Sequence, residues 1–359
     1  MRDLLDEHHI VRQPPFGDLA LHEAEDVFFG RALALLQHDH KKRVRQPARA
    51  KRKGASSRLP YALQLPGAKI YQGMIRTTAM GAKKRDHYNP ILLLKHFANA
   101  DGLIYVFDKR QPHRLVQPLG PKSVFVHKHL YSEFMPDGTR RRELDDFYTA
   151  LEALADPIVN KITMAARAGR LPGLSAEEKS IWDLFLYNQW RRVPDSYERF
   201  SFNESDVKTL LAEYERQYHP LTDEQRTHWS APRTLARLRQ NVHVDALKRQ
   251  SLNVLHILGG RGLGIGVISK PNKSFITSSF PVVKLTNPET PQLDHPTTEA
   301  WIAIAPDVAV TPAGERGEER VVEVSDDHHV RGLNRALFQQ STSIAGRSRE
   351  LVASLAGIK

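Results

Sequence analysis

The sequence predicts an α+β fold, in which a mixed sheet is built from N-terminal and C-terminal strands and a helical block lies between them in the chain. Three observations predict it. Short strand-like segments open the core, apolar residues then recur every three or four positions over about 143–258, and further strand-like segments follow with a last helix. Strands and helices that occupy separate stretches indicate the α+β class.

Composition excludes several classes of protein. The chain has 359 residues, enough for one large domain or two. It has no cysteine, which excludes disulfides, cysteine-ligated zinc, iron–sulfur clusters and a thiol nucleophile. The start "MRDLLDEHHI" has no apolar signal region, and no apolar run approaches the roughly 18 residues of a spanning helix. We expect a soluble, cytoplasmic protein with no membrane partner.

Residues 1–82 are expected to form an N-terminal extension, with a helix over 19–37 and a basic tail over 41–58. The tail holds nine lysines and arginines and no acid, so it supplies most of the net charge of +11. Such a tail would meet nucleic-acid phosphates by counterion release. A solvated, disordered linker has the same composition, and both interpretations stay open.

The core is expected to span 83–359. "GLIYVFDK" (102–109) is rich in β-forming residues and follows an Asp-Gly turn, so it predicts a strand. "KSVFVHKHLYSEF" (122–134) is a second strand candidate. In the helical block, Ser175 and Glu178 form a capping box that predicts a helix start.

The rest of the helical block follows from periodicity and proline. The helix that begins at the capping box should end before Pro194, because the residue preceding a proline avoids the α region. Further helices are predicted over 204–218 and 232–257. Four late segments predict strands: "LGIGVISK", "SFITSSFPVVKLT", "AWIAIAPDVAVT" and "RVVEVS". The spacing of apolar residues predicts a last helix over 329–356.

Three motifs occur in a fixed order along the core. The first reads H-Y-x-P, an apolar run, and a strand that ends in Asp. Its residues are His87, Tyr88, Pro90, Leu94, Phe97, Tyr105 and Asp108. The second comprises "FYTALEALADPIVNKI" and "WDLFLYNQWRRVP", and the third is "FITSSFPV" followed by Pro306 and Asn334. In this order they resemble a bacterial family, domain of unknown function 4238, over about 83–350.

The resemblance implies no reaction, but it marks a departure at one position. The family's late motif is similar to F-I-T-S-D-N-P-V, and this chain has Ser279 at the acidic position and Phe280 at the next. If that acid binds a metal or acts as a base in relatives, the site of this chain is altered.

His87 is the first candidate catalytic residue. It follows Lys83, Lys84 and Arg85, which would favour its neutral form and could bind an anionic ligand. A neutral imidazole beside cations suits a general base acting near a phosphate. In the structural alternative, His87 satisfies backbone groups in the turn before Pro90.

Hydroxyl groups at a late strand end form the second candidate site. Thr277, Ser278 and Ser279 could hold an oxyanion or phosphate through their hydroxyls and backbone N–H groups. The same residues could simply form a turn that ends the strand. We expect Thr277 and Ser279 to face His87 and Asp108 across one cleft, with the two ends of the core side by side.

A divalent metal is the third possibility. His127 and His129 stand at i and i+2 of a predicted strand, where both rings would face one side. Exposed histidines on an edge strand are the structural alternative. A nuclease-like acid pair is also present in Pro306-Asp307 and Glu323-Val324-Ser325, although Ser325 replaces the lysine such sites require.

Three polar residues complete the candidate ligand site. Arg192 lies seven residues after Phe185, so it shares the core face of its helix and needs a partner, for which Glu152, Asp183 and Asp108 are candidates. Gln189 and Asn334 are the two others that could contact an anionic ligand.

The leading functional expectation is a bacterial protein that acts on or binds nucleic acid, with a phosphodiester hydrolase of defence or toxin type as its catalytic form. The basic tail and the Lys83–Arg85 cluster motivate it. Two alternatives stay open: a non-enzymatic binding or scaffold module, and an enzyme acting on a small phosphorylated ligand.

Overall fold

The fold is α+β, as the sequence predicts. The computed structural model describes residues 85–135, 137–197, 204–217, 220–287 and 289–358. The predicted helix over 19–37, the basic tail, Lys83 and Lys84 lie outside these residues. Among the described helices, none combines the length and apolar character that crossing a membrane requires.

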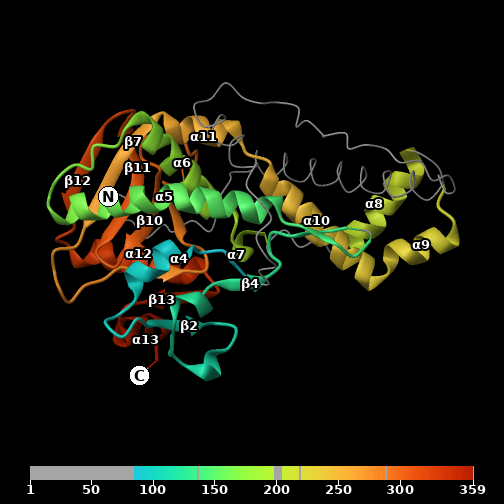
Figure 1. The fold of residues 1–359 in the computed structure, drawn as a ribbon, viewed down its shortest axis with the longest axis horizontal. Coiled ribbons are helices and arrows are strands. Elements are labelled where there is room, and N and C mark those ends of the chain that lie inside the picture. Colours follow the sequence, from blue (N-terminus) through green and yellow to red (C-terminus); the bar gives the residue numbers. More distant parts are fainter. Residues whose placement is uncertain (1–84, 136, 198–203, 218–219, 288, 359) are drawn as a thin grey trace.

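One sheet joins the two ends of the core. Its strand order is β3-β2-β13-β8, and all neighbours are antiparallel. The strands are β2 (Ile104–Asp108), β3 (Gln117–Leu119), β8 (Thr277–Ser278) and β13 (Ser343–Gly346). Since β13 lies between β2 and β8, the C-terminal part of the chain joins the early and late motifs in one sheet, as the sequence predicts, but this sheet is antiparallel and not mixed. Figure 1 shows β2 and β13 next to each other.

A second sheet consists of C-terminal strands alone, in the order β12-β7-β11-β10-β9. The strands are β7 (Arg261–Val267), β9 (Val282–Leu285), β10 (Glu299–Ala305), β11 (Val308–Glu315) and β12 (Glu319–Glu323). β12 runs parallel to β7, and the other pairs are antiparallel. Gly262 permits this packing, because a Cβ there would lie 2.3 Å from the Glu318 carbonyl oxygen.

The helical block separates the two groups of strands in sequence. Its helices are α5 (Glu143–Arg167), α6 (Ala176–Arg191), α7 (Pro194–Tyr197), α8 (Glu204–Gln217), α9 (Asp223–Ser230), α10 (Pro232–Lys248) and α11 (Leu252–Gly259). α5 packs across β7, β10 and β11, while α8, α9 and α10 extend away from the two larger sheets (Figure 1). The predicted capping box is present at the start of α6.

Two predicted helices are interrupted. The helix predicted over 232–257 divides into α10 and α11, and Ser251 caps the second by accepting from the Val254 N–H. The last helix, predicted over 329–356, is wrong in its middle: α12 (Asp327–Gln340) and α13 (Arg349–Ala356) flank the strand β13. There, pairing with β2 and β8 satisfies the backbone of a buried segment and overrides the helical spacing.

The strand predicted over 122–134 is also divided. Phe125 and His129 have φ angles of 52° and 56°, a conformation that ends a strand. Only β4 (Val126–Lys128) and β5 (Glu133–Phe134) remain, paired with β1 (Arg85–His87) and β6 (Arg140–Arg141). Between β1 and β2 lie α4 (Ile91–Leu94) and a 3-10 turn over Lys95–Phe97, and two more such turns cover Pro112–Arg114 and Pro121–Ser123.

Candidate functional site

The early and late motifs meet in the interior of the protein. The Asn89 side-chain amide donates to Thr277 Oγ1 at 2.8 Å and to the Ser278 carbonyl at 3.2 Å, and all three residues are buried. Asp108 stands opposite Ser343 in the β2–β13 ladder, and the Ser343 carbonyl accepts from the Ser279 N–H. The two ends of the core are therefore side by side, as the sequence predicts.

Hydrogen bonds between the two motifs come from Asn89, two residues after the predicted His87. His87 lies on β1, where it is the register partner of Val126 on β4. Arg85, at the other end of that three-residue strand, is exposed. Thr277 receives the Asn89 amide and is 1% exposed, so its hydroxyl serves the packing of the two motifs.

Ser279 belongs to a buried polar cluster around Asp195. The Ser279 hydroxyl donates to Asp195 Oδ2 and accepts from the backbone N–H groups of Thr342 and Ser343, each at 3.1 Å. Asp195 also accepts from the Thr342 N–H at 2.7 Å and from its hydroxyl at 2.9 Å. These hydrogen bonds connect α7 to Thr342 and Ser343, at the start of β13.

Asp195 was missed by the sequence analysis. The available signal was its place directly after Pro194, where the second family motif ends. Because Ser279 already uses its donor and accepts two N–H groups, the arrangement accounts for it as a structural residue.

Arg192 is fully buried and forms an ion pair with Glu152, at 2.8 Å between Nη1 and Oε1. Of the three partners that the sequence suggests, the structure selects this one. The guanidinium also donates to the Tyr88 carbonyl and to Gln189 Oε1. Burial lowers the pKa of Arg192, but Glu152 together with Tyr131 and Tyr148 outweighs this effect, and the net pKa is raised. Arg192 and Gln189 thus hold the first motif onto α5 and α6.

Asp108 and Asn334 are likewise engaged with protein groups. The Asp108 carboxylate accepts from the Arg110 guanidinium at 3.2 and 3.3 Å, and this hydrogen bond is the main reason that the pKa of Arg110 is raised. Asn334 accepts from the Ile276 N–H at 3.0 Å and donates to the Ser274 carbonyl at 2.9 Å. Its side chain therefore connects the segment before β8, residues 274–276, to α12.

The predicted pairing of His127 and His129 on one strand is wrong, because β4 ends at Lys128. Arg140 Nη1 lies 2.8 Å from Nε2 and 3.3 Å from Nδ1 of His129, so a guanidinium occupies the side where a metal would bind. In the described part of the chain, no group of three or more His, Cys, Asp or Glu side chains is placed to hold a metal ion.

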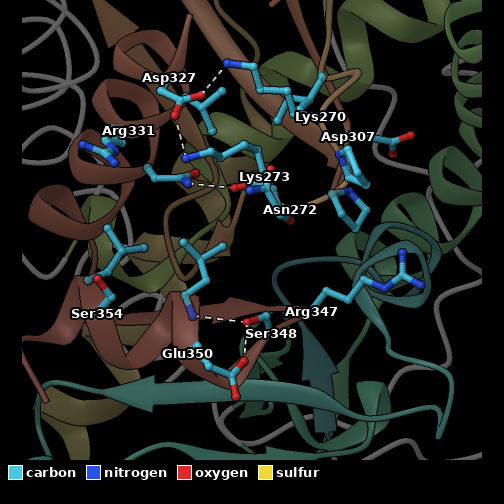
Figure 2. A pocket seen from close by; sticks show the side chains of 18 of the residues that line it. Lys270, Asn272, Lys273, Asp307, Asp327, Arg331, Arg347, Ser348, Glu350 and Ser354 are labelled. Atoms are coloured by element: carbon cyan, nitrogen blue, oxygen red, sulfur yellow. Dashed lines mark hydrogen bonds and ion pairs between the residues drawn. The ribbon is translucent and has the colours of Figure 1, made fainter. Parts of the chain in front are cut away.

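A cleft that the sequence analysis did not predict lies between the 269–274 loop, α12 and the start of α13 (Figure 2). Its volume is about 1380 Å³. Six cationic side chains line it: Arg167, Lys270, Lys273, Arg331, Arg335 and Arg347. Three acidic side chains accompany them: Asp307, Asp327 and Glu350. None of the predicted catalytic residues lines this cleft.

The acids are already engaged. Arg167 binds Asp307 through two hydrogen bonds of 2.6 and 2.7 Å; burial alone would raise the pKa of Asp307, but Arg167 brings it below its usual value. Glu350 accepts from the Ser348 hydroxyl at 2.7 Å. Asp307, one acid of the nuclease-like pair, is therefore held by a guanidinium.

Three arginines in the cleft remain open. Arg331, Arg335 and Arg347 are exposed, and no carboxylate of the described residues lies within ion-pair distance of them. Arg331 and Arg335 stand four residues apart on α12, so they share one face of the helix. This open positive charge is the cleft's main chemical property.

The comparisons with known proteins show the family and nothing further. A family described as "Protein of unknown function (DUF4238)" matches residues 85–350. The chain therefore belongs to this family, as the three motifs predict. No curated protein and no solved structure matches it.

Proposed function

We propose that the protein binds nucleic acid, and that the cleft between the 269–274 loop, α12 and α13 holds the phosphate backbone. The single observation that carries this proposal is the group of three open arginines, Arg331, Arg335 and Arg347, in one cleft. The proposal concerns binding. Hydrolysis of the bound strand stays a prediction from the sequence, for which the residues in the cleft supply no separate argument.

Arginine suits this role for physical reasons. Its planar guanidinium presents several N–H donors and binds phosphate oxygens in pairs. Two arginines on one helix face can contact neighbouring phosphates of a strand. Arg347 lies in the turn before α13, across the cleft from Arg331 (Figure 2). Phosphate contacts hold a nucleic acid without reading its sequence. The basic tail over 41–58 would add a second contact of the same kind.

A charge-matched pair of variants tests the proposal. We expect Arg331→Gln, Arg335→Gln and Arg347→Gln together to weaken binding of a fluorescein-labelled DNA duplex, measured by fluorescence anisotropy. Each lost phosphate contact removes about 0.9 from the slope of log K against log salt, so the slope should fall by up to about 2.7.

The matched control replaces three exposed arginines outside the cleft: Arg114→Gln, Arg233→Gln and Arg239→Gln. It loses the same net charge, and we expect its slope to change by less than about one unit. Equal losses in both variants, or no salt-dependent binding by the wild type, would argue against the cleft. Competition by inorganic pyrophosphate at concentrations that leave ionic strength unchanged would favour a small phosphorylated ligand instead.

A further inference from the structure

Asp327 neutralises the two lysines of the cleft. It lies in the first turn of α12, and its carboxylate accepts from Lys270 at 3.0 Å and is paired with Lys273 at 2.6 Å (Figure 2). Both lysines belong to the 269–274 loop, so a single acid gathers two cations of one loop. The hydrogen bonds from Lys273 and Lys270 lower the pKa of Asp327 to about 2, and it stays ionised at every physiological pH.

The three groups are all in contact with solvent. The side chains of Lys270, Lys273 and Asp327 are 46%, 25% and 34% exposed. Ion pairs between solvent-exposed groups contribute little to stability, because water and salt screen them. A phosphate oxygen can therefore take the place of the carboxylate oxygen without unfolding the loop.

Carboxylate and phosphate oxygens accept the same hydrogen bonds from an ammonium group. The position of the Asp327 carboxylate thus marks where two lysines would place a phosphate. Arg331 is four residues further along α12, on the same face as Asp327. Arg331 therefore stands next to the lysine pair along α12, in the same cleft.

We propose that Lys270 and Lys273 form a further phosphate site in the cleft, which the Asp327 carboxylate occupies in the free protein and for which it competes. This inference rests on the proposed nucleic-acid binding. Asp327 then limits the number of phosphates that the cleft binds. The affinity of the cleft for nucleic acid is consequently lower than it would be if both lysines were free to bind phosphate.

The helix is expected to survive removal of this charge. The N-cap of α12 is Asp326, whose side chain accepts from the His328 N–H at 2.8 Å. Asp327→Asn leaves that cap in place and keeps the shape of the side chain while it releases both lysines. Glu350→Gln is the matched control, because it removes one negative charge from the same cleft but contacts a serine hydroxyl.

The experiment measures oligonucleotide affinity against salt for the full-length wild type and these variants, with thermal melting of each. We expect Asp327→Asn to bind more tightly and to steepen the salt slope by about 1.8, from two further phosphate contacts. Glu350→Gln should leave the slope unchanged. Adding Lys270→Gln and Lys273→Gln to Asp327→Asn should return the slope to the wild-type value.

The double variant Lys270→Gln with Lys273→Gln, which keeps Asp327, tests the inference even if Asp327→Asn unfolds at a lower temperature. We expect it to weaken binding less than the cleft-arginine variant does, since Asp327 competes with phosphate for both lysines. Weakening comparable to that of the cleft-arginine variant would overturn the inference. A salt slope of Asp327→Asn equal to that of Glu350→Gln would also overturn the inference. If the cleft-arginine variant still lowered the slope as expected, the proposed function would stand without this further site. Absence of binding in every variant would end both proposals.

Discussion

Replacing Glu152 by alanine is expected to lower the free energy of unfolding by about 3 kcal/mol, since removing one partner of a buried ion pair leaves the other charge uncompensated. Arg192 has an exposed side-chain fraction of only 1%, whereas that of Glu152 is 26%. Most of the lost free energy therefore comes from Arg192, which stays buried without a counter-ion. Chemical denaturation with urea measures the loss.

The double variant Glu152→Ala with Arg192→Met separates the ion pair from general packing. Methionine fills part of the space without a charge, so the double variant should lose less free energy than the two single variants summed. Additive losses would show that the two side chains are not coupled. A loss in Glu152→Ala below about 1 kcal/mol would place Arg192 in contact with water, contrary to the structure.

Replacing Ser279 by aspartate is expected to destabilise the protein by at least about 3 kcal/mol at pH 8, because it buries a second carboxylate against Asp195. Ser279 is fully buried and has the Asp195 carboxylate as its hydrogen-bond acceptor. Two carboxylates in one buried site cannot both ionise cheaply, so one of them binds a proton in the folded state.

The destabilisation caused by Ser279→Asp is expected to depend on pH. A carboxyl group that holds its proton more tightly in the folded than in the unfolded state stabilises the fold at low pH, and the contribution is lost as pH rises. The loss in Ser279→Asp should therefore shrink from pH 8 to pH 5, as measured by thermal melting. Ser279→Asn has the same shape without charge and should show no such trend. Asp195→Asn should restore Ser279→Asp at pH 8, and failure to do so would contradict the geometry of this cluster.

Local sequence patterns predicted the elements whose structure is set locally. The capping box of α6 and the strand "GLIYVFDK" follow from hydrogen bonding and residue type within a few positions, and both are present. The strand β13 could not be predicted in this way. Its residues, Ser343–Gly346, fit a helical spacing of apolar positions, and only its partners β2 and β8 make it a strand.

The same distinction between local and long-range contacts applies to the candidate site. Order in the sequence was sufficient to place the early and late motifs together, but not to identify Asn89 as the residue that joins them. The cleft depends on β13, because this strand separates α12 from α13 and brings Arg347 to the cleft that Arg331 and Arg335 line. A sequence interpretation with one continuous helix over 329–356 could not place these three arginines in one cleft.

Arginine footprinting tests the central claim most directly. The full-length protein is treated with phenylglyoxal in the presence and absence of an oligonucleotide, and modified arginines are identified by mass spectrometry. We expect bound oligonucleotide to protect Arg331, Arg335 and Arg347 while Arg233 and Arg239 react as in the free protein. Protection confined to the arginines of residues 41–58, with the three cleft arginines still reactive, would contradict binding in the cleft.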